Sequence, residues 1–248
     1  MYDQFFRTAM LYGAESINKL KNRRVAVFGI GGVGGHCAEA LCRCGVGAIG
    51  LYDGDVVDIT NINRQIIATH KTIGRDKVDA MRERLLEINP DIAVGAYKLF
   101  YLPQTADAVD LSVYDYIVDA IDTITSKLEL VCRAGALGIP VISSMGAAGK
   151  LDPTALQVAD VFETSVCPMA RVMRGELRKR GVKALKVVYS KEQPVACATF
   201  DQEAGQDAGP GDCGQDTRSG KVRASNAFVP PVAGLIIAAE VVKDLISS

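Results

Sequence analysis

The 248-residue sequence contains seven cysteines but no C-x-x-C pair. A four-cysteine zinc site needs such closely spaced thiols and therefore has no support in the sequence. Cys37, Ala40, Leu41 and Cys44 instead fall on one face of a predicted helix, together with Val33. This arrangement is typical of cysteines that serve as small buried hydrophobic side chains in the reducing cytoplasm.

An excess of charge is absent as well, because 28 lysines and arginines nearly balance 29 acidic residues. The chain is therefore no generic polyanion binder, and any contact with nucleic acid must come from a local patch. The N-terminus lacks the basic-then-apolar order of a signal peptide. The apolar stretch 228–246 is interrupted by Pro230-Pro231, Glu240, Lys243 and Asp244. These interruptions favour a packed helix over a membrane span, so we expect a cytoplasmic protein with no stable membrane span.

Strand and helix patterns alternate through the first 150 residues. Strands are expected at 24–28, 49–52, 92–99, 116–120 and 141–144, and helices at 3–20, from near 33, at 75–88 and at 124–137. This alternation predicts an α/β fold with a Rossmann-like, mostly parallel sheet flanked by helices. In the first helix, Phe6, Met10, Ile17 and Leu20 are expected to form the apolar face. Ligands of such folds bind at the carboxyl ends of the strands.

The C-terminal half is less regular and is expected to add strands and a final helix. We predict a strand at 156–161, a basic helix at 168–180, a mobile loop over about 190–222 and a helix after Pro231. The loop prediction rests on the glycine-rich, acidic composition of 201–216. We expect one domain, with an N-terminal helical arm over 1–23, a nucleotide-binding core over 24–150 and a C-terminal substrate and dimer part over 151–248.

A glycine-rich turn follows the first predicted strand, in the run Gly29-Ile-Gly31-Gly32-Val-Gly34. Glycines there allow the backbone to approach a phosphate closely, and the N-terminus of the following helix favours negative charge. The motif alone is weak, because many nucleotide-binding folds use it.

Four charged side chains at later positions sharpen the prediction. Asp53 ends the second strand, where a carboxylate can accept both ribose hydroxyls; a plain strand-end turn at Asp-Gly is the alternative. Arg64 is placed to clamp phosphate oxygens, and Lys77, at the start of a helix, to add a point charge; each is otherwise an ordinary solvated residue. Asp122 follows the fourth strand, where it would hold magnesium on the phosphates. Asp119 is assigned to the strand end and its hydrogen bonding.

Together these groups indicate ATP with its phosphates gripped and magnesium present. Contacts to the α-phosphate and to the leaving pyrophosphate suit adenylation, in which a carboxylate attacks the α-phosphorus and becomes an acyl-adenylate. The residue types do not identify the carboxylate that is activated.

Five motifs resemble the adenylating domain shared by ubiquitin-activating enzymes and the bacterial ThiF and MoeB proteins. They are the glycine run, Asp53-Gly-Asp55, Asn61-Ile-Asn63-Arg64-Gln65, Gly74-Arg-Asp-Lys77 and Asp119-Ala-Ile-Asp122. Further segments are similar to the tRNA threonylcarbamoyladenosine dehydratases, the TcdA/CsdL group. These are Thr8-Ala-Met-Leu-Tyr-Gly13, Ile88-Asn-Pro90, Gly146-Ala-Ala-Gly149-Lys-Leu-Asp-Pro153, and Pro168-Met-Ala with the basic helix behind it.

This resemblance implies ATP-dependent cyclisation of the threonylcarbamoyl group beside a tRNA anticodon, with loss of water. It implies ATP and Mg as cofactors, with Asp53 on the ribose, Arg64 and Lys77 on the phosphates and Asp122 on magnesium. The other nucleotide-binding residues that it implies are Gly29, Gly31, Gly32, Gly34, Asp55, Asn61, Asn63 and Gln65. It also implies a homodimer in which Arg7 reaches the neighbouring subunit's ATP as a further catalytic residue. The expected partners are tRNA at its anticodon region, a second copy of the chain and sulfur-transfer proteins.

One departure from the family pattern concerns cysteine. Some members carry a cysteine before the last helix, where this chain has Arg223-Ala-Ser, so a thioester at that position is unavailable. Cys167 and Cys213 are formal substitutes, but an intramolecular cyclisation needs no enzyme nucleophile. We expect both to be buried or loop cysteines.

A basic segment supports the expectation of tRNA binding. Seven bases stand against the single acid Glu176: Arg171, Arg174, Arg178, Lys179, Arg180, Lys183 and Lys186. Such a run can contact phosphates, and a solvated basic helix is the alternative.

Three other functions share part of the pattern. An activating enzyme for a ubiquitin-like sulfur carrier would use every nucleotide-binding residue. A nicotinamide-dependent oxidoreductase explains the glycines and Asp53 but leaves Arg64, Lys77 and Asp122 without a role. A non-catalytic nucleotide-binding scaffold stays open from sequence alone.

Overall fold

The computed structural model describes residues 3–195 and 224–247. A seven-stranded sheet has the order β3-β2-β1-β4-β5-β7-β6. Its strands are β1 (Arg24–Phe28), β2 (Ala48–Tyr52), β3 (Ala93–Tyr97), β4 (Tyr116–Asp119), β5 (Val141–Ser144), β6 (Leu156–Asp160) and β7 (Lys186–Ser190). Neighbouring strands are parallel except β6, which runs antiparallel to β7 at the edge. The α/β fold with a mostly parallel sheet is therefore confirmed.

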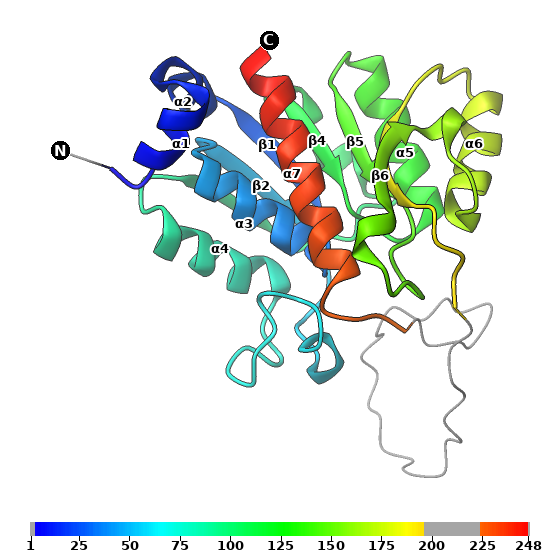
Figure 1. Ribbon diagram of the computed structural model, residues 1–248, viewed down its shortest axis with the longest axis horizontal. Helices are drawn as coiled ribbons and strands as arrows, with labels where there is room; N and C mark the ends of the chain where they lie inside the picture. Colours follow the sequence, from blue (N-terminus) through cyan, green and yellow to red (C-terminus); the bar gives the residue numbers. More distant parts are fainter. Residues whose placement is uncertain (1–2, 196–223, 248) are drawn as a thin grey trace.

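Helices cover both faces of the sheet (Figure 1). They are α1 (Phe6–Tyr12), α2 (Ala14–Lys21), α3 (Gly34–Cys44), α4 (Lys77–Ile88), α5 (Ile124–Ala136), α6 (Pro168–Lys179) and α7 (Val229–Ser247). Short 3-10 turns are η1 (Ile59–Asn61), η2 (Ala106–Ala108), η3 (Leu111–Val113), η4 (Pro153–Ala155) and η5 (Val161–Glu163). No helix in the described ranges is long and apolar enough to cross a membrane.

Apolar side chains divide the core into two layers. Helices α2, α3, α4 and α7 share one hydrophobic cluster on one face of the sheet, while α5 and α6 pack on the other. The final helix α7 lies directly against α3 (Figure 1), and a Cβ on Gly234 would stand 2.3 Å from the carbonyl oxygen of Val33. The C-terminal helix therefore belongs to the nucleotide-binding half of the fold.

The register of the central strands places three loops side by side. Phe28 at the end of β1 pairs with Tyr52 of β2 and with Asp119 of β4. The chain order reverses between β1 and β4, which is where open α/β sheets bind their ligands. The glycine turn and the two aspartate motifs consequently meet at one edge.

The structure corrects one sequence prediction and adds one strand. The helix expected over 3–20 is split at Gly13, whose φ of +87° ends α1 and redirects the chain into α2. Ile17 and Leu20 are buried as expected, but Phe6 and Met10 are exposed. Strand β7 was not predicted, because its short apolar run lies between the basic segment and the region read as a loop.

Candidate functional site: a nucleotide site at the carboxyl edge of the sheet

The glycine turn packs too tightly for side chains at two of its positions. Gly29 has a φ of +87°, and a Cβ there would lie 2.7 Å from the carbonyl oxygen of Ala120. A Cβ on Gly34 would lie 1.8 Å from the carbonyl oxygen of Gly29. At Gly31 the nearest atom to a new Cβ is 3.8 Å away, on Gln65. Gly29 and Gly34 thus serve the fold, whereas Gly31 leaves its backbone accessible to a ligand.

Asp53 is oriented by two backbone donors at the end of β2. Its Oδ2 accepts a hydrogen bond from the Ile30 N–H at 2.6 Å, and its Oδ1 accepts one from the Asp55 N–H at 2.8 Å. Burial raises the pKa of the Asp53 carboxyl, and the nearby Lys77 opposes that shift. The first of these bonds ties the carboxylate directly to the glycine turn.

Lys77 opens helix α4 and is held over the same strand end. Its Nζ donates to Asp55 Oδ2 at 2.7 Å, and its N–H donates to the Asp55 carbonyl at 3.1 Å. The Lys77 side chain is 7% exposed and that of Asp55 35% exposed. A nearly buried ammonium with a solvent-facing partner is positioned to exchange that partner for a phosphate.

The Asn61–Gln65 segment begins with a capping box at η1. Asp58 and Asn61 satisfy each other's backbone N–H groups. Arg64 donates to the Thr60 carbonyl at 3.0 Å and to Asn63 Oδ1 at 2.9 Å. The Arg64 Cγ lies 3.4 Å from the position of a Cβ on Gly32, so this side chain runs beside the glycine turn.

Two amides complete that segment. Asn63 Nδ2 donates to the Ser225 carbonyl at 3.0 Å and so links Arg64 to the chain that enters α7. Gln65 is buried, and its Oε1 accepts no hydrogen bond from the described part of the protein. A buried acceptor without a donor is costly, and its place beneath Gly31 makes it a candidate ligand contact.

The two aspartates after β4 differ in environment. Asp119 is fully buried and accepts hydrogen bonds from Lys127, Ser143 and the Ile121 N–H. The expected hydrogen-bonding role of Asp119 is thus confirmed, but the sequence analysis missed its buried partner Lys127. A lysine in the first turn of a helix carries no signal that it is buried. Asp122 is exposed beyond the strand end.

The fit of magnesium rests on donor chemistry. Among residues 3–195 and 224–247, no three histidine, cysteine or acidic side chains gather as a metal site. Magnesium bound to a nucleotide is typically held by one or two carboxylates plus phosphate oxygens, with water completing the shell. The exposed carboxylate of Asp122 fits that mode, whereas the described part of the chain forms no all-protein site.

Arg7 lies away from these residues within one chain. Its neighbours Gln4 and Phe5 contact Asn89 and Gly45, which follow the C-termini of α4 and α3. The phosphate-site residues stand at the N-termini of the same helices, and 11 to 12 residues of helix span about 16–18 Å. Exposed Arg7 therefore does not join these residues within the chain.

Five of the seven bases of the 171–186 segment contact other groups of the chain. Arg174 donates to the Thr164 carbonyl at 2.8 Å, and the Arg178 guanidinium lies 5.2 Å from the centre of the Phe162 ring. Lys179 and Arg180 pair with Glu176, and Lys186 pairs with Asp244. Arg171 and Lys183 are exposed, and Arg178, Lys179 and Arg180 are exposed as well despite these contacts.

The cysteines in the described part of the chain are buried or partly buried, as the sequence predicted. Cys37, Leu41 and Cys167 are buried, and Val33, Ala40 and Cys44 pack partly buried against the core. Cys167 precedes α6 beside Gly146. Cys213, Arg223 and most of the predicted 190–222 loop lie outside the described residues.

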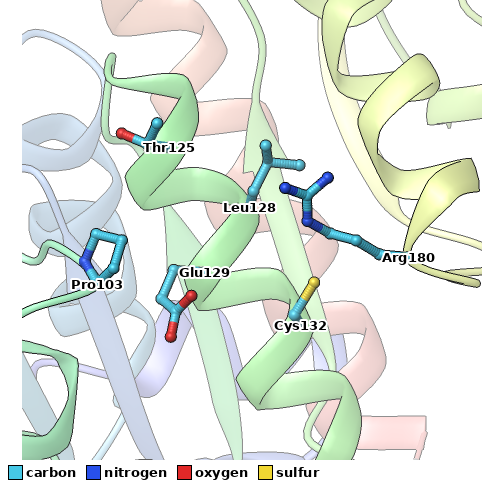
Figure 2. A pocket seen from close by; sticks show the side chains of 6 residues that line it. All are labelled: Pro103, Thr125, Leu128, Glu129, Cys132 and Arg180. Carbon is cyan, nitrogen blue, oxygen red and sulfur yellow. The ribbon is translucent and has the colours of Figure 1, made fainter.

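Two surface pockets lie along α5 rather than at the nucleotide site. One of about 500 Å³ is lined by α5, Pro103 and Arg180, and Figure 2 shows Arg180 reaching toward Leu128 and Cys132. A second of about 580 Å³ continues past Cys132 to Lys186 and Asp244 at the opposite edge of the sheet. Neither is lined by a predicted nucleotide-binding residue.

Known proteins match this chain along nearly its full length. A tRNA threonylcarbamoyladenosine dehydratase of Bacillus subtilis is 45% identical, with 99% of this chain and 96% of the relative covered. The crystal structure of the E. coli tRNA N6-threonylcarbamoyladenosine dehydratase TcdA in complex with ATP has a TM-score of 0.82 and 31% identity, covering 98% of this chain and 94% of that chain. Its complex with AMP gives a TM-score of 0.84.

A relative from another functional group matches less of the chain. The adenylyltransferase and sulfurtransferase uba4 of Aspergillus clavatus is 35% identical over 53% of this chain and 27% of its own length. The chain belongs to the ThiF family, whose model matches residues 5–247, and within it to the tRNA threonylcarbamoyladenosine dehydratases.

Proposed function

We propose that the protein catalyses the ATP-dependent dehydration of N6-threonylcarbamoyladenosine in tRNA, through an acyl-adenylate. The observation that carries the proposal is the similarity to a dehydratase of this name, which is 45% identical over 99% of this chain. The complexes of TcdA with ATP and with AMP support a nucleotide that is cleaved between its α- and β-phosphates.

The proposed reaction has two bond exchanges. A carboxylate oxygen of the substrate attacks the α-phosphorus, and the bond to pyrophosphate breaks. The nitrogen on the adenine then attacks the acyl carbon, loses its proton and displaces AMP. The carboxylate oxygen leaves with AMP, so the product is a cyclic hydantoin lighter than the substrate by one water.

Each proposed role follows from position and charge. Asp53 accepts the ribose hydroxyls, and the backbone at Gly31 and Gly32 approaches the phosphates. Lys77 and Arg64 neutralise charge on the pyrophosphate as it leaves, which a preorganised site does with little reorganisation. Asn61, Asn63 and Gln65 shape this phosphate-binding segment, and Asp55 holds Lys77 until the nucleotide arrives.

Magnesium is the proposed second cofactor, and Asp122 is the residue that would hold it against the phosphates. When bound, the ion neutralises phosphate charge and polarises the α-phosphorus. The side chains of the protein orient the nucleotide around the ion.

A homodimer is proposed to complete the site. Arg7 is remote from the nucleotide residues of its own chain, so a contribution to catalysis requires a second subunit. Helix α1 also exposes Met10 at 73% and Leu11 at 77% beside Arg7, as expected of a surface that another copy covers.

The proposed macromolecular substrate is tRNA near its anticodon, in the cytoplasm. Arg171 and Lys183 are the proposed phosphate contacts, because both are exposed and the other five bases of the 171–186 segment contact groups of the same chain. Binding to sulfur-transfer proteins stays a prediction. Activation of a sulfur carrier is the less favoured function, since the relative of that kind matches only half of the chain.

Mass spectrometry of tRNA nucleosides tests the proposal. Purified protein with ATP and Mg²⁺ is expected to convert threonylcarbamoyladenosine in tRNA to the product lighter by one water, and the folded D122A variant is expected to leave it unchanged. Absence of product, with pyrophosphate exchange that depends on a small protein ending in Gly-Gly, would instead establish the sulfur-carrier function.

A further inference from the structure

A buried triad lies directly beneath the nucleotide site. Lys127 Nζ donates to Asp119 Oδ2 at 3.0 Å and to Ser143 Oγ at 3.1 Å, and Ser143 Oγ donates to the same Asp119 oxygen at 2.5 Å. All three side chains are fully buried. They join the carboxyl ends of β4 and β5 to the first turn of α5.

The triad determines where the 120–123 connection runs. Asp119 uses its second oxygen, Oδ1, to accept from the Ile121 N–H at 3.2 Å, and the Ala120 N–H donates to the Phe28 carbonyl at 2.8 Å. The Lys127 N–H bonds to the Thr123 carbonyl at 3.1 Å. Both ends of the connection that carries Asp122 are thereby attached to the same buried carboxylate.

This connection is also one wall of the glycine turn. The Ala120 carbonyl approaches Gly29 so closely that a Cβ there would stand 2.7 Å from it, and the Ala120 methyl would be 3.2 Å from a Cβ on Gly34. A small shift of 120–123 must therefore move the glycine turn. The triad sits where it can hold both parts of the nucleotide site in register.

Stability alone is a poor reason to keep such a triad. Burial of a carboxylate and an ammonium carries a desolvation cost, and apolar side chains of similar volume often stabilise a core equally well or better. Directional hydrogen bonds, in contrast, orient a backbone segment in a way that apolar packing does not.

We propose that Lys127 and Ser143 are positioning residues for ATP binding, which act through Asp119 on the backbone of 120–122. They do not touch the nucleotide. This inference rests on the proposed function only in assuming an ATP site. Removal of the Lys127 or Ser143 side chain should loosen that site while the global fold survives. In metal sites, mutation of the residues that orient the metal ligands typically changes affinity by about 10–100-fold, and we expect an effect of that order here.

Calorimetric titration with ATP and Mg²⁺ tests the inference on the full-length protein. The K127M variant is expected to weaken ATP binding about tenfold or more, and S143A by a smaller factor, at a temperature where each is fully folded. The matched control is K186M, which breaks the ion pair with Asp244 at the opposite edge of the sheet. It is expected to bind ATP like the parent.

Hydrogen exchange separates positioning from general destabilisation. In S143A, faster exchange is expected at the amides of Ala120, Ile121 and Asp122 and not across the distant strand β3. S143A leaves no unpaired ion, so it tests the inference even if K127M fails to fold. Parent-like ATP affinity in folded S143A and K127M, or exchange raised throughout the protein, overturns it. Failure of the parent to modify tRNA while it binds ATP would overturn the proposed function and leave this inference standing.

Discussion

A pair of glycine substitutions separates the structural glycines of the turn from the one that meets the ligand. We expect G34A to destabilise the fold and G31A to leave the fold intact while it weakens ATP binding. A Cβ at position 34 would overlap the Gly29 carbonyl oxygen at 1.8 Å, whereas at position 31 the nearest atom is 3.8 Å away. The two changes add the same methyl group three residues apart.

The magnitudes follow from these contacts. Forcing an extra carbon into a packed core costs about 1–3 kcal/mol, or roughly 2–12 °C of melting temperature at this chain length. At an unobstructed position, alanine in place of glycine stabilises by about 0.4–1 kcal/mol, since the unfolded chain loses freedom. Loss of one hydrogen bond between a backbone N–H and a charged phosphate costs about 1.5–3 kcal/mol, so ATP affinity should fall roughly 10- to 100-fold in G31A.

Thermal melting without nucleotide and calorimetric titration with ATP measure the two effects independently. G31A should melt at or slightly above the parent temperature and bind ATP weakly, while G34A should melt lower. Parent-like ATP affinity in G31A would refute the assignment of this backbone to the phosphates. A parent-like melting temperature in G34A would refute the packing argument.

Three further predictions concern assembly, tRNA and pH. Mixing R7A with D122A, each inactive alone, should restore part of the activity through hybrid dimers; no recovery after verified subunit exchange would place Arg7 outside the site. Charge reversal of Arg171 and Lys183 to glutamate should weaken tRNA binding and lower the slope of log affinity against log salt by about 2, with ATP affinity kept as the control. Burial raises the pKa of Asp53, and only the ionised carboxylate accepts both ribose hydroxyls, so ATP affinity should fall on acidification at a pH above the ordinary aspartate range. The D53N variant should bind ATP weakly at every pH. An ATP affinity of the parent that stays constant through that pH range would contradict the role of Asp53.

Much of the nucleotide half could be predicted because its signals are local. The run of buried residues in β1, the glycine turn and the start of α3 are adjacent in the chain, and their periodicity reports burial directly. The alternation of strands with helices then implies a parallel sheet, and parallel strands bring their following loops to one edge. The sequence alone therefore predicts that Asp53 and Asp122 follow strands at the carboxyl edge and that Lys77, at the start of a helix, faces the same phosphates.

Other features depend on contacts between distant segments, which no local pattern records. Strand β7 forms because its short run pairs with both β5 and β6, and the burial of Lys127 depends on Ser143 from another strand. The tertiary structure likewise decided that Arg174 is engaged with Thr164, and that Arg7 is separated from the phosphate site by about the length of helix α3 or α4. The sequence by itself determined which residue types carry the chemistry, because type and spacing are local. Only the fold decided which of them meet, because proximity across the chain depends on packing.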